Sequence, residues 1–290
     1  MSNEPSLEID RGPLPTRPSR PSRPIVLRVQ GRQHGPIRRV VSPSDLGELI
    51  KPFVFLDYFE FEPTPHNLFG MHPHSGIATI TWLLEGGIRY EDTTGKSGRL
   101  PVGSVEWMRA GSGVWHDGSM AEGDHLRGLQ LWIALPAELE LAPADSQYMA
   151  PSEIPTIGPA RLAFGTYEGV TSPTPSPAGM NYLSVNLKKG DTWTYTPPRG
   201  HDVGWLYVHE GTVQAAGESL SSELAVFEES EDAIRVTAST DAGFVLGSAR
   251  KHPHDLVLGR YSVHTSREAL AAGESGIAEI GALLRRAGRI

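Results

Sequence analysis

Residues 72–116 read HPHSGIATITWLLEGGIRYEDTTGKSGRLPVGSVEWMRAGSGVWH, and they carry the clearest strand and turn signals of the chain. Its central part, 77–92, is rich in β-branched and aromatic residues, contains a Gly-Gly pair and runs into the turn-forming sequence DTTGKSG. Short runs of this kind, separated by glycine and proline, are typical of β-sandwiches and β-barrels. The stretch therefore predicts several short strands of one closed β-domain.

His72 and His74 form the densest chemical signal in this stretch. One residue separates them, so in an extended strand both side chains point to the same face and can approach one ion. Pro73 fixes its own φ and biases His72 toward extended geometry, which partly preorganises the pair. The sequence contains no cysteine, so any metal must be held by histidine nitrogen or carboxylate oxygen.

Further strands are predicted on both sides of the quoted stretch. A strand begins at Ile25, the run FVFLDYFEF covers 53–61, and a second set of strands follows between 180 and 249. The two sets indicate an all-β chain of two barrels. We predict four parts: a disordered tail rich in proline and arginine (1–24), an N-terminal barrel domain with the histidine pair (25–140), a linker (141–160), and a second barrel domain that ends in a helix (161–290).

The end of the chain is the exception to this β pattern. Residues 266–286 have helical periodicity, and Ser266 is a suitable N-cap for a short C-terminal helical segment. Gly273 and Gly276 lie within that segment, and we expect them to break it, because glycine is a poor helix former.

Composition excludes several classes of function. The net charge is −8, which argues against direct nucleic-acid binding. No apolar run is long enough to span a membrane, and the first residues lack the apolar core of a secretion signal. We therefore expect a cytoplasmic protein that binds no membrane.

The quoted stretch, with FVFLDYFEF before it and LVLGRYSVHTSREAL at 256–270, resembles the pirin family, and the resemblance covers roughly residues 36–270. It implies two cupin barrels with one metal in the N-terminal barrel, held by an H-x-H pair and a later H-x-E. The histidines of that pattern carry over as His72, His74 and His116. The metal implied is one divalent transition ion, iron in most pirins, with Ni, Mn, Co and Zn left open.

The carboxylates of the family pattern do not carry over. The glutamate of H-x-E falls at Gly118, and a second family glutamate falls at Ala78. Asp117, Glu106 and Glu122 are possible replacements, although Asp117 faces away from His116 on a regular strand. The simpler interpretation is a site of three neutral imidazoles with water in the open positions. No catalytic residue is assigned.

Three functions remain open. The resemblance implies a mononuclear metal dioxygenase that acts on a flavonol- or catechol-like aromatic substrate such as quercetin. It also allows a regulator that binds a protein partner according to the oxidation state of its metal. The missing glutamates allow a third function, a degenerate cupin without metal.

The remaining histidines and tryptophans are interpreted as structural. We expect His252 and His254 in a loop, and His201 and His209 in a second barrel that holds no metal. We expect His66 and His125 to be exposed on the surface rather than to line the mouth of the N-terminal pocket. The four tryptophans predicted on N-terminal strands are expected to fill the core rather than to face a substrate: Trp82, Trp107, Trp115 and Trp132.

Overall fold

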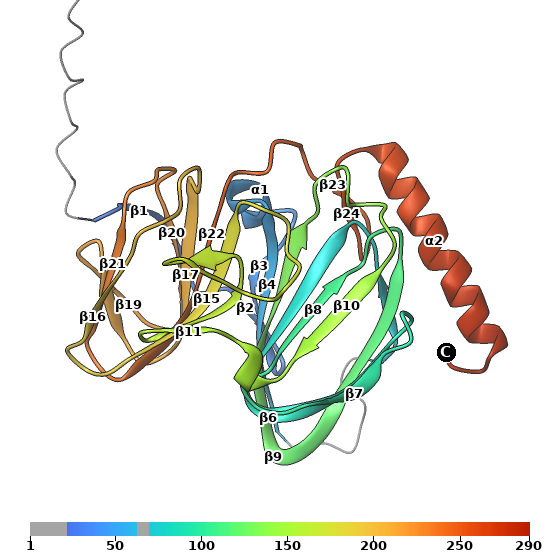
Figure 1. Cartoon of the computed structure of the whole chain (residues 1–290), viewed down its shortest axis with the longest axis horizontal. Coiled ribbons are helices and arrows are strands. Elements are labelled where there is room, and N and C mark those ends of the chain that lie inside the picture. Colours follow the sequence, from blue (N-terminus) through green and yellow to red (C-terminus); the bar gives the residue numbers. More distant parts are fainter. Residues whose placement is uncertain (1–21, 63–69) are drawn as a thin grey trace, which may run out of the picture.

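The computed structural model describes residues 22–62 and 70–290, and the side chains of residues 121–124 are also outside the description. The chain forms two β-barrels side by side with one long helix at the C-terminal end (Figure 1). This is the all-β, two-barrel architecture predicted from the sequence. No helix in the described ranges is long and apolar enough to cross a membrane.

The N-terminal barrel is a nine-stranded sheet that curls around the predicted metal site. Its longest strands, β6 (Ile77–Asp92) and β9 (Val114–Ala134), pair with each other over most of their length. Two short strands attach to them: β5 (His72–His74) pairs with β9, and β7 (Ser97–Leu100) pairs with β6. Apart from these two short strands, the order across the sheet is β10 (Asp145–Met149), β8 (Val105–Arg109), β6, β9, β4 (Phe53–Phe61), β3 (Ile37–Val41) and β2 (Arg32–His34).

The C-terminal barrel consists of a seven-stranded and a four-stranded sheet, with a closed apolar core between them. The first sheet has the order β1 (Ile25–Val29), β20 (Leu224–Phe227), β17 (Val203–Glu210), β22 (Ala242–Ala249), β15 (Met180–Leu187), β12 (Ala160–Phe164) and β11 (Thr156–Ile157). The second has the order β16 (Thr192–Tyr195), β21 (Ile234–Ala238), β18 (Val213–Ala215) and β19 (Glu218–Leu220).

Short elements complete the chain. They are α1 (Leu46–Ile50), the 3₁₀ turn η1 (Pro151–Glu153), the pair β13 (Thr166–Tyr167) and β14 (Val170–Thr171), and the pair β23 (Val257–Leu258) and β24 (Val263–His264). The C-terminal helix α2 covers Arg267–Arg286.

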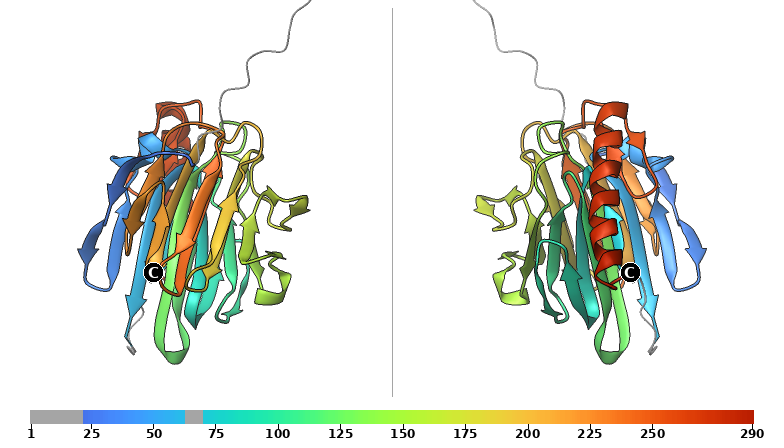
Figure 2. Two further views of the ribbon diagram at one scale, coloured as in Figure 1. Left: turned by 90° about the vertical axis from the view of Figure 1, so that its left-hand side faces the viewer. Right: turned by 90° about the vertical axis from the view of Figure 1, so that its right-hand side faces the viewer.

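Each end of the described chain packs on the barrel that is distant from it in sequence. Strand β1, predicted as part of the N-terminal domain, pairs with β20 of the C-terminal barrel, where Leu27 lies opposite Val226. Helix α2 lies along the outside of the N-terminal barrel (Figure 2), where Trp115 donates a hydrogen bond from Nε1 to the carbonyl of Ile277. The two barrels are therefore tied together by both ends of the chain.

Aromatic side chains fill the space between the barrels. Phe53 contacts Trp205 with ring centroids 5.4 Å apart, and Trp82 contacts Tyr182 at 5.7 Å. Trp82 is buried as expected, but between the barrels rather than inside one, as is Trp107. Residues on a strand alternate between two faces, so this arrangement turns the neighbours of the two tryptophans toward the interior of the N-terminal barrel.

Helix α2 is continuous, so the expectation that its glycines break it was wrong. Ser266 caps the helix as predicted, accepting a hydrogen bond of 3.1 Å from the amide of Ala269. The glycines instead allow close packing: a Cβ at Gly273 would lie 2.5 Å from His264 Nε2, and one at Gly281 would lie 2.8 Å from the ring of Trp115. The packing of the helix on the barrel offsets the low helix propensity of these residues.

Candidate metal centre

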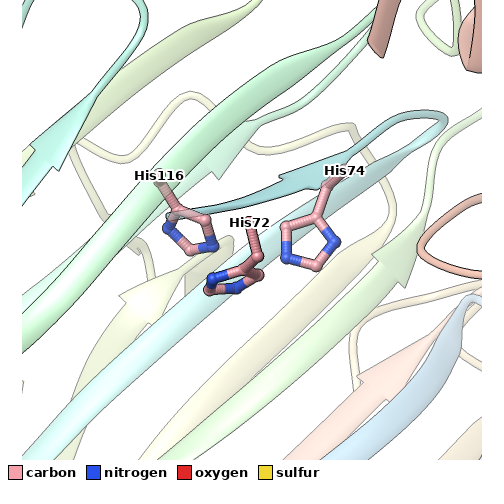
Figure 3. A group of neighbouring side chains, drawn as sticks. All are labelled: His72, His74 and His116. Carbon is pink, nitrogen blue, oxygen red and sulfur yellow. The ribbon is translucent and has the colours of Figure 1, made fainter. Parts of the chain in front are cut away.

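Strands β5 and β9 bring the three predicted ligands together. In the register between them His72 lies directly opposite His116, and His74 lies two residues further along β5 on the same face. The ring centroids are 4.4 Å apart for His72 and His116, 5.0 Å for His72 and His74, and 5.1 Å for His74 and His116. Ligand nitrogens of all three lie within 4.8 Å of one another (Figure 3). Such a cluster has the size and the donors to hold one metal ion.

Contacts at Nδ1 orient two of the three rings. Nδ1 of His72 lies 2.8 Å from the carbonyl oxygen of Gly70, and Nδ1 of His74 lies 3.1 Å from that of Tyr261. A carbonyl oxygen only accepts, so these Nδ1 atoms carry the proton and leave the Nε2 lone pair available. Nε2 of His116 is buried and has no hydrogen-bond partner among the described residues.

The same burial keeps two of the rings neutral. Burial, reinforced by the neighbouring His116, lowers the pKa of His72 to about 4 and holds the pKa of His74 well below its usual range. Neutral imidazole is the form that binds a metal. A buried polar atom without a partner costs about 1–3 kcal/mol, and a metal at Nε2 of His116 would remove that cost. The donor set therefore fits a first-row divalent ion.

No carboxylate joins the three imidazoles within the described part of the chain. A Cβ at Gly118 would have one neighbour, Ile88 Cδ1 at 3.9 Å, so a longer side chain has room there. Ala78 lies in the core between the barrels. Of the possible replacements, Glu106 faces the Nδ1 side of His116, and Asp117 is outside the cluster. The side chain of Glu122 lies outside the described residues.

The imidazoles border a cavity of about 400 Å³. Phe55 and Trp132 stack in its wall with centroids 4.0 Å apart and an angle of 8° between the rings. The rings of Trp132 and His74 pack edge to face with centroids 4.9 Å apart, and the guanidinium of Arg39 lies 4.0 Å from the ring centroid of Phe55. All four tryptophans of the N-terminal strands were expected in the core, but Trp132 lines the cavity instead. We call this cavity the aromatic slot, and the three imidazoles of the candidate metal site form part of its lining.

The C-terminal segment also reaches this cavity, which sequence reasoning missed. Tyr261 and Ser262 line it, and the hydroxyl of Ser75, directly after His74, donates a hydrogen bond of 2.8 Å to the hydroxyl of Ser262. Ser75 also lies 3.0 Å from Nε2 of His264, whose Nδ1 lies 3.1 Å from Glu140. This buried network attaches the segment before α2 to the histidine strand β5. No spacing in the sequence signals a contact over so many residues.

The remaining histidines lie elsewhere. His201 bonds to Ser248 in the C-terminal barrel at 2.9 Å, and both ring nitrogens of His209 are buried there. His252 lies 3.2 Å from the carbonyl of Leu135, and His125 lies 3.3 Å from Glu60. His66 falls outside the described residues. Among those that are described, the cluster at 72, 74 and 116 is the one group of three potential metal ligands.

Two barrels, one of them with three convergent histidines, define a bicupin with a candidate metal centre in its N-terminal half. The family model for pirin matches residues 35–133. A pirin-like protein of Caulobacter vibrioides is 34% identical over 215 residues, which cover 70% of this chain and 77% of that protein. The chain therefore belongs to the pirin family.

Two further comparisons concern a named activity. A protein of Pseudomonas aeruginosa, provisionally named a quercetin 2,3-dioxygenase, is 28% identical over 251 residues, which cover 81% of this chain and 87% of that protein. The crystal structure of a quercetin 2,3-dioxygenase from Acinetobacter baumannii superimposes with a TM-score of 0.81 and covers 88% of this chain and 96% of that one. At 23% identity, this likeness shows the common fold.

Proposed function

We propose that this protein binds one divalent first-row metal through His72, His74 and His116 and acts as a dioxygenase on a flavonol- or catechol-like aromatic molecule. One observation carries the proposal: Nε2 of His116, buried and without a hydrogen-bond partner in the described part of the chain, lies with two further imidazoles in the lining of an aromatic-walled cavity. The provisional naming of the relative from Pseudomonas aeruginosa supports the choice of reaction.

The walls of the cavity suit a flat aromatic ligand. Its volume of about 400 Å³ falls within the range of small-molecule sites, about 300–1,000 Å³. Trp132 and Phe55 offer flat aromatic surface, and aromatic rings contribute about 0.5–1.5 kcal/mol per stacked or edge contact beyond burial. Gln130 and Thr81, also on the lining, supply polar atoms that can bond phenolic hydroxyls.

A bound metal would supply positive charge and open positions for the oxygens of the substrate. The residues of the chain hold and shield that position. The carbonyls of Gly70 and Tyr261 fix two of the rings through Nδ1, and Arg39, paired with Asp57 in the wall, places a cation next to the slot.

The direct test uses purified protein loaded separately with Fe(II), Mn(II), Ni(II) or Co(II) and incubated with quercetin and O₂. Elemental analysis should find about one metal per chain, and the flavonol absorption band should decay. His116→Ala should lose both the metal and the decay. A stoichiometric metal without decay of the band under any of the four ions would remove quercetin as substrate, and absence of metal would favour the metal-free alternative.

A further inference from the structure

Glu106 is a buried carboxylate that contacts the candidate ligand His116. It lies on β8, is 4% exposed, and places Oε1 3.4 Å from Nδ1 of His116. Its other oxygen, Oε2, accepts a hydrogen bond from the hydroxyl of Thr81, which also lies 2.9 Å from Oε1 of Gln130. Both oxygens are therefore engaged, and the side chain has a fixed position.

The direction of this contact matters for its role. Glu106 contacts Nδ1, whereas the nitrogen of His116 that is buried and has no hydrogen-bond partner in residues 22–62 and 70–290 is Nε2, on the other side of the ring. A ligand carboxylate would have to lie on the Nε2 side with the three ligand nitrogens, and Glu106 is outside that cluster of described residues. It occupies the position from which a carboxylate orients a metal-binding imidazole through its Nδ1–H.

Charge gives the contact a second consequence. A buried carboxylate is stable only with polar partners, and Glu106 has the hydroxyl of Thr81 at Oε2 and Nδ1 of His116 at Oε1. A divalent ion at Nε2 draws electron density from the ring and makes Nδ1–H a stronger donor to the carboxylate. Metal binding and the burial of Glu106 thus stabilise each other, through one imidazole ring.

We propose that Glu106 is a positioning residue of the metal centre. It contacts the Nδ1 side of His116 and supplies there the negative charge that the family pattern would place at position 118. The inference rests on the metal site of the proposed function, and it concerns metal affinity rather than turnover. It explains how a site of three neutral imidazoles can retain a doubly charged ion without a carboxylate ligand.

The test measures Co(II) affinity by competition with a chelator, together with the visible spectrum of the bound ion. Glu106→Gln keeps the shape and removes the charge. Loss of such a partner weakens metal binding about 10–100-fold, and we expect that loss with a shifted spectrum. Thr81→Val, which removes the donor to Oε2, should weaken binding in the same direction by about 3–10-fold. Glu223→Gln, which alters a buried carboxylate of the C-terminal barrel, is the matched control and should leave affinity unchanged.

A rescue experiment separates charge from general damage. Gly118→Glu in the Glu106→Gln background should restore affinity, because position 118 has room for a side chain. Wild-type affinity and spectrum in both Glu106→Gln and Thr81→Val would overturn the inference. Cobalt bound by the wild type, with no decay of the flavonol band under any of the four ions, would remove quercetin as substrate and leave the role of Glu106 intact, whereas no cobalt binding by the wild type would end both proposals.

Discussion

Replacing Gly273 by alanine tests the packing of α2 on the N-terminal barrel, because two effects of opposite sign compete at this residue. In an exposed helix the change would stabilise by about 1 kcal/mol through helix propensity. Here the added Cβ would lie 2.5 Å from both Ser75 Oγ and His264 Nε2, two atoms that are 3.0 Å apart. Contacts below 3.4 Å are already tight, so both side chains would have to move by roughly an ångström.

The cost of that movement exceeds the gain in propensity. Overpacking a core costs about 1–3 kcal/mol, and separating the buried pair Ser75 and His264 adds about 1–3 kcal/mol. We therefore expect Gly273→Ala to lower the free energy of unfolding by about 3 kcal/mol, measured by urea titration with circular dichroism. Ala278→Gly, at an exposed position of α2, is the control and should cost about 1 kcal/mol from propensity alone. A Gly273→Ala protein more stable than the wild type would refute the close packing.

Three further predictions concern other buried groups. Burial lowers the pKa of His201 from 6.5 to about 4, so the unfolded chain binds the proton first as the pH falls below 6.5. His201→Gln should therefore remove about 2–3 kcal/mol of the stability loss between pH 6.5 and 4.5 in the metal-free protein, and an unchanged loss would contradict this. Glu140 accepts bonds from the amide (2.7 Å) and the hydroxyl (2.6 Å) of Thr265; Glu140→Gln should cost about 1–3 kcal/mol and speed hydrogen exchange in β24 and the start of α2, whereas wild-type exchange would argue against this anchor. Trp132 contacts the ring of His74, so Trp132→Phe should reduce the quenching of tryptophan fluorescence by bound Ni(II) or Co(II), and quenching equal to that of the wild type would contradict a metal beside His74.

Much of the architecture followed from local patterns in the sequence. Short β-branched runs between glycines and prolines predicted an all-β chain, because strand propensity and turn formation depend on neighbouring residues. The spacing of His72 and His74 placed both on one face of a strand for the same reason. His116 was predicted as the third ligand through the resemblance of residues 72–116 to the pirin family.

The tertiary structure decided the features that depend on contacts between distant residues. The register of β5 on β9 sets His72 opposite His116, and the pairing of β8 with β6 brings Glu106 next to Thr81. Whether a glycine interrupts α2 or lets it pack closely also depends on the residues that lie against it. Gly273 allows close packing because Ser75 and His264 are its neighbours. Hydrogen bonds between strands and the fit of a helix on a sheet join residues far apart in the chain, so no local window of sequence contains them.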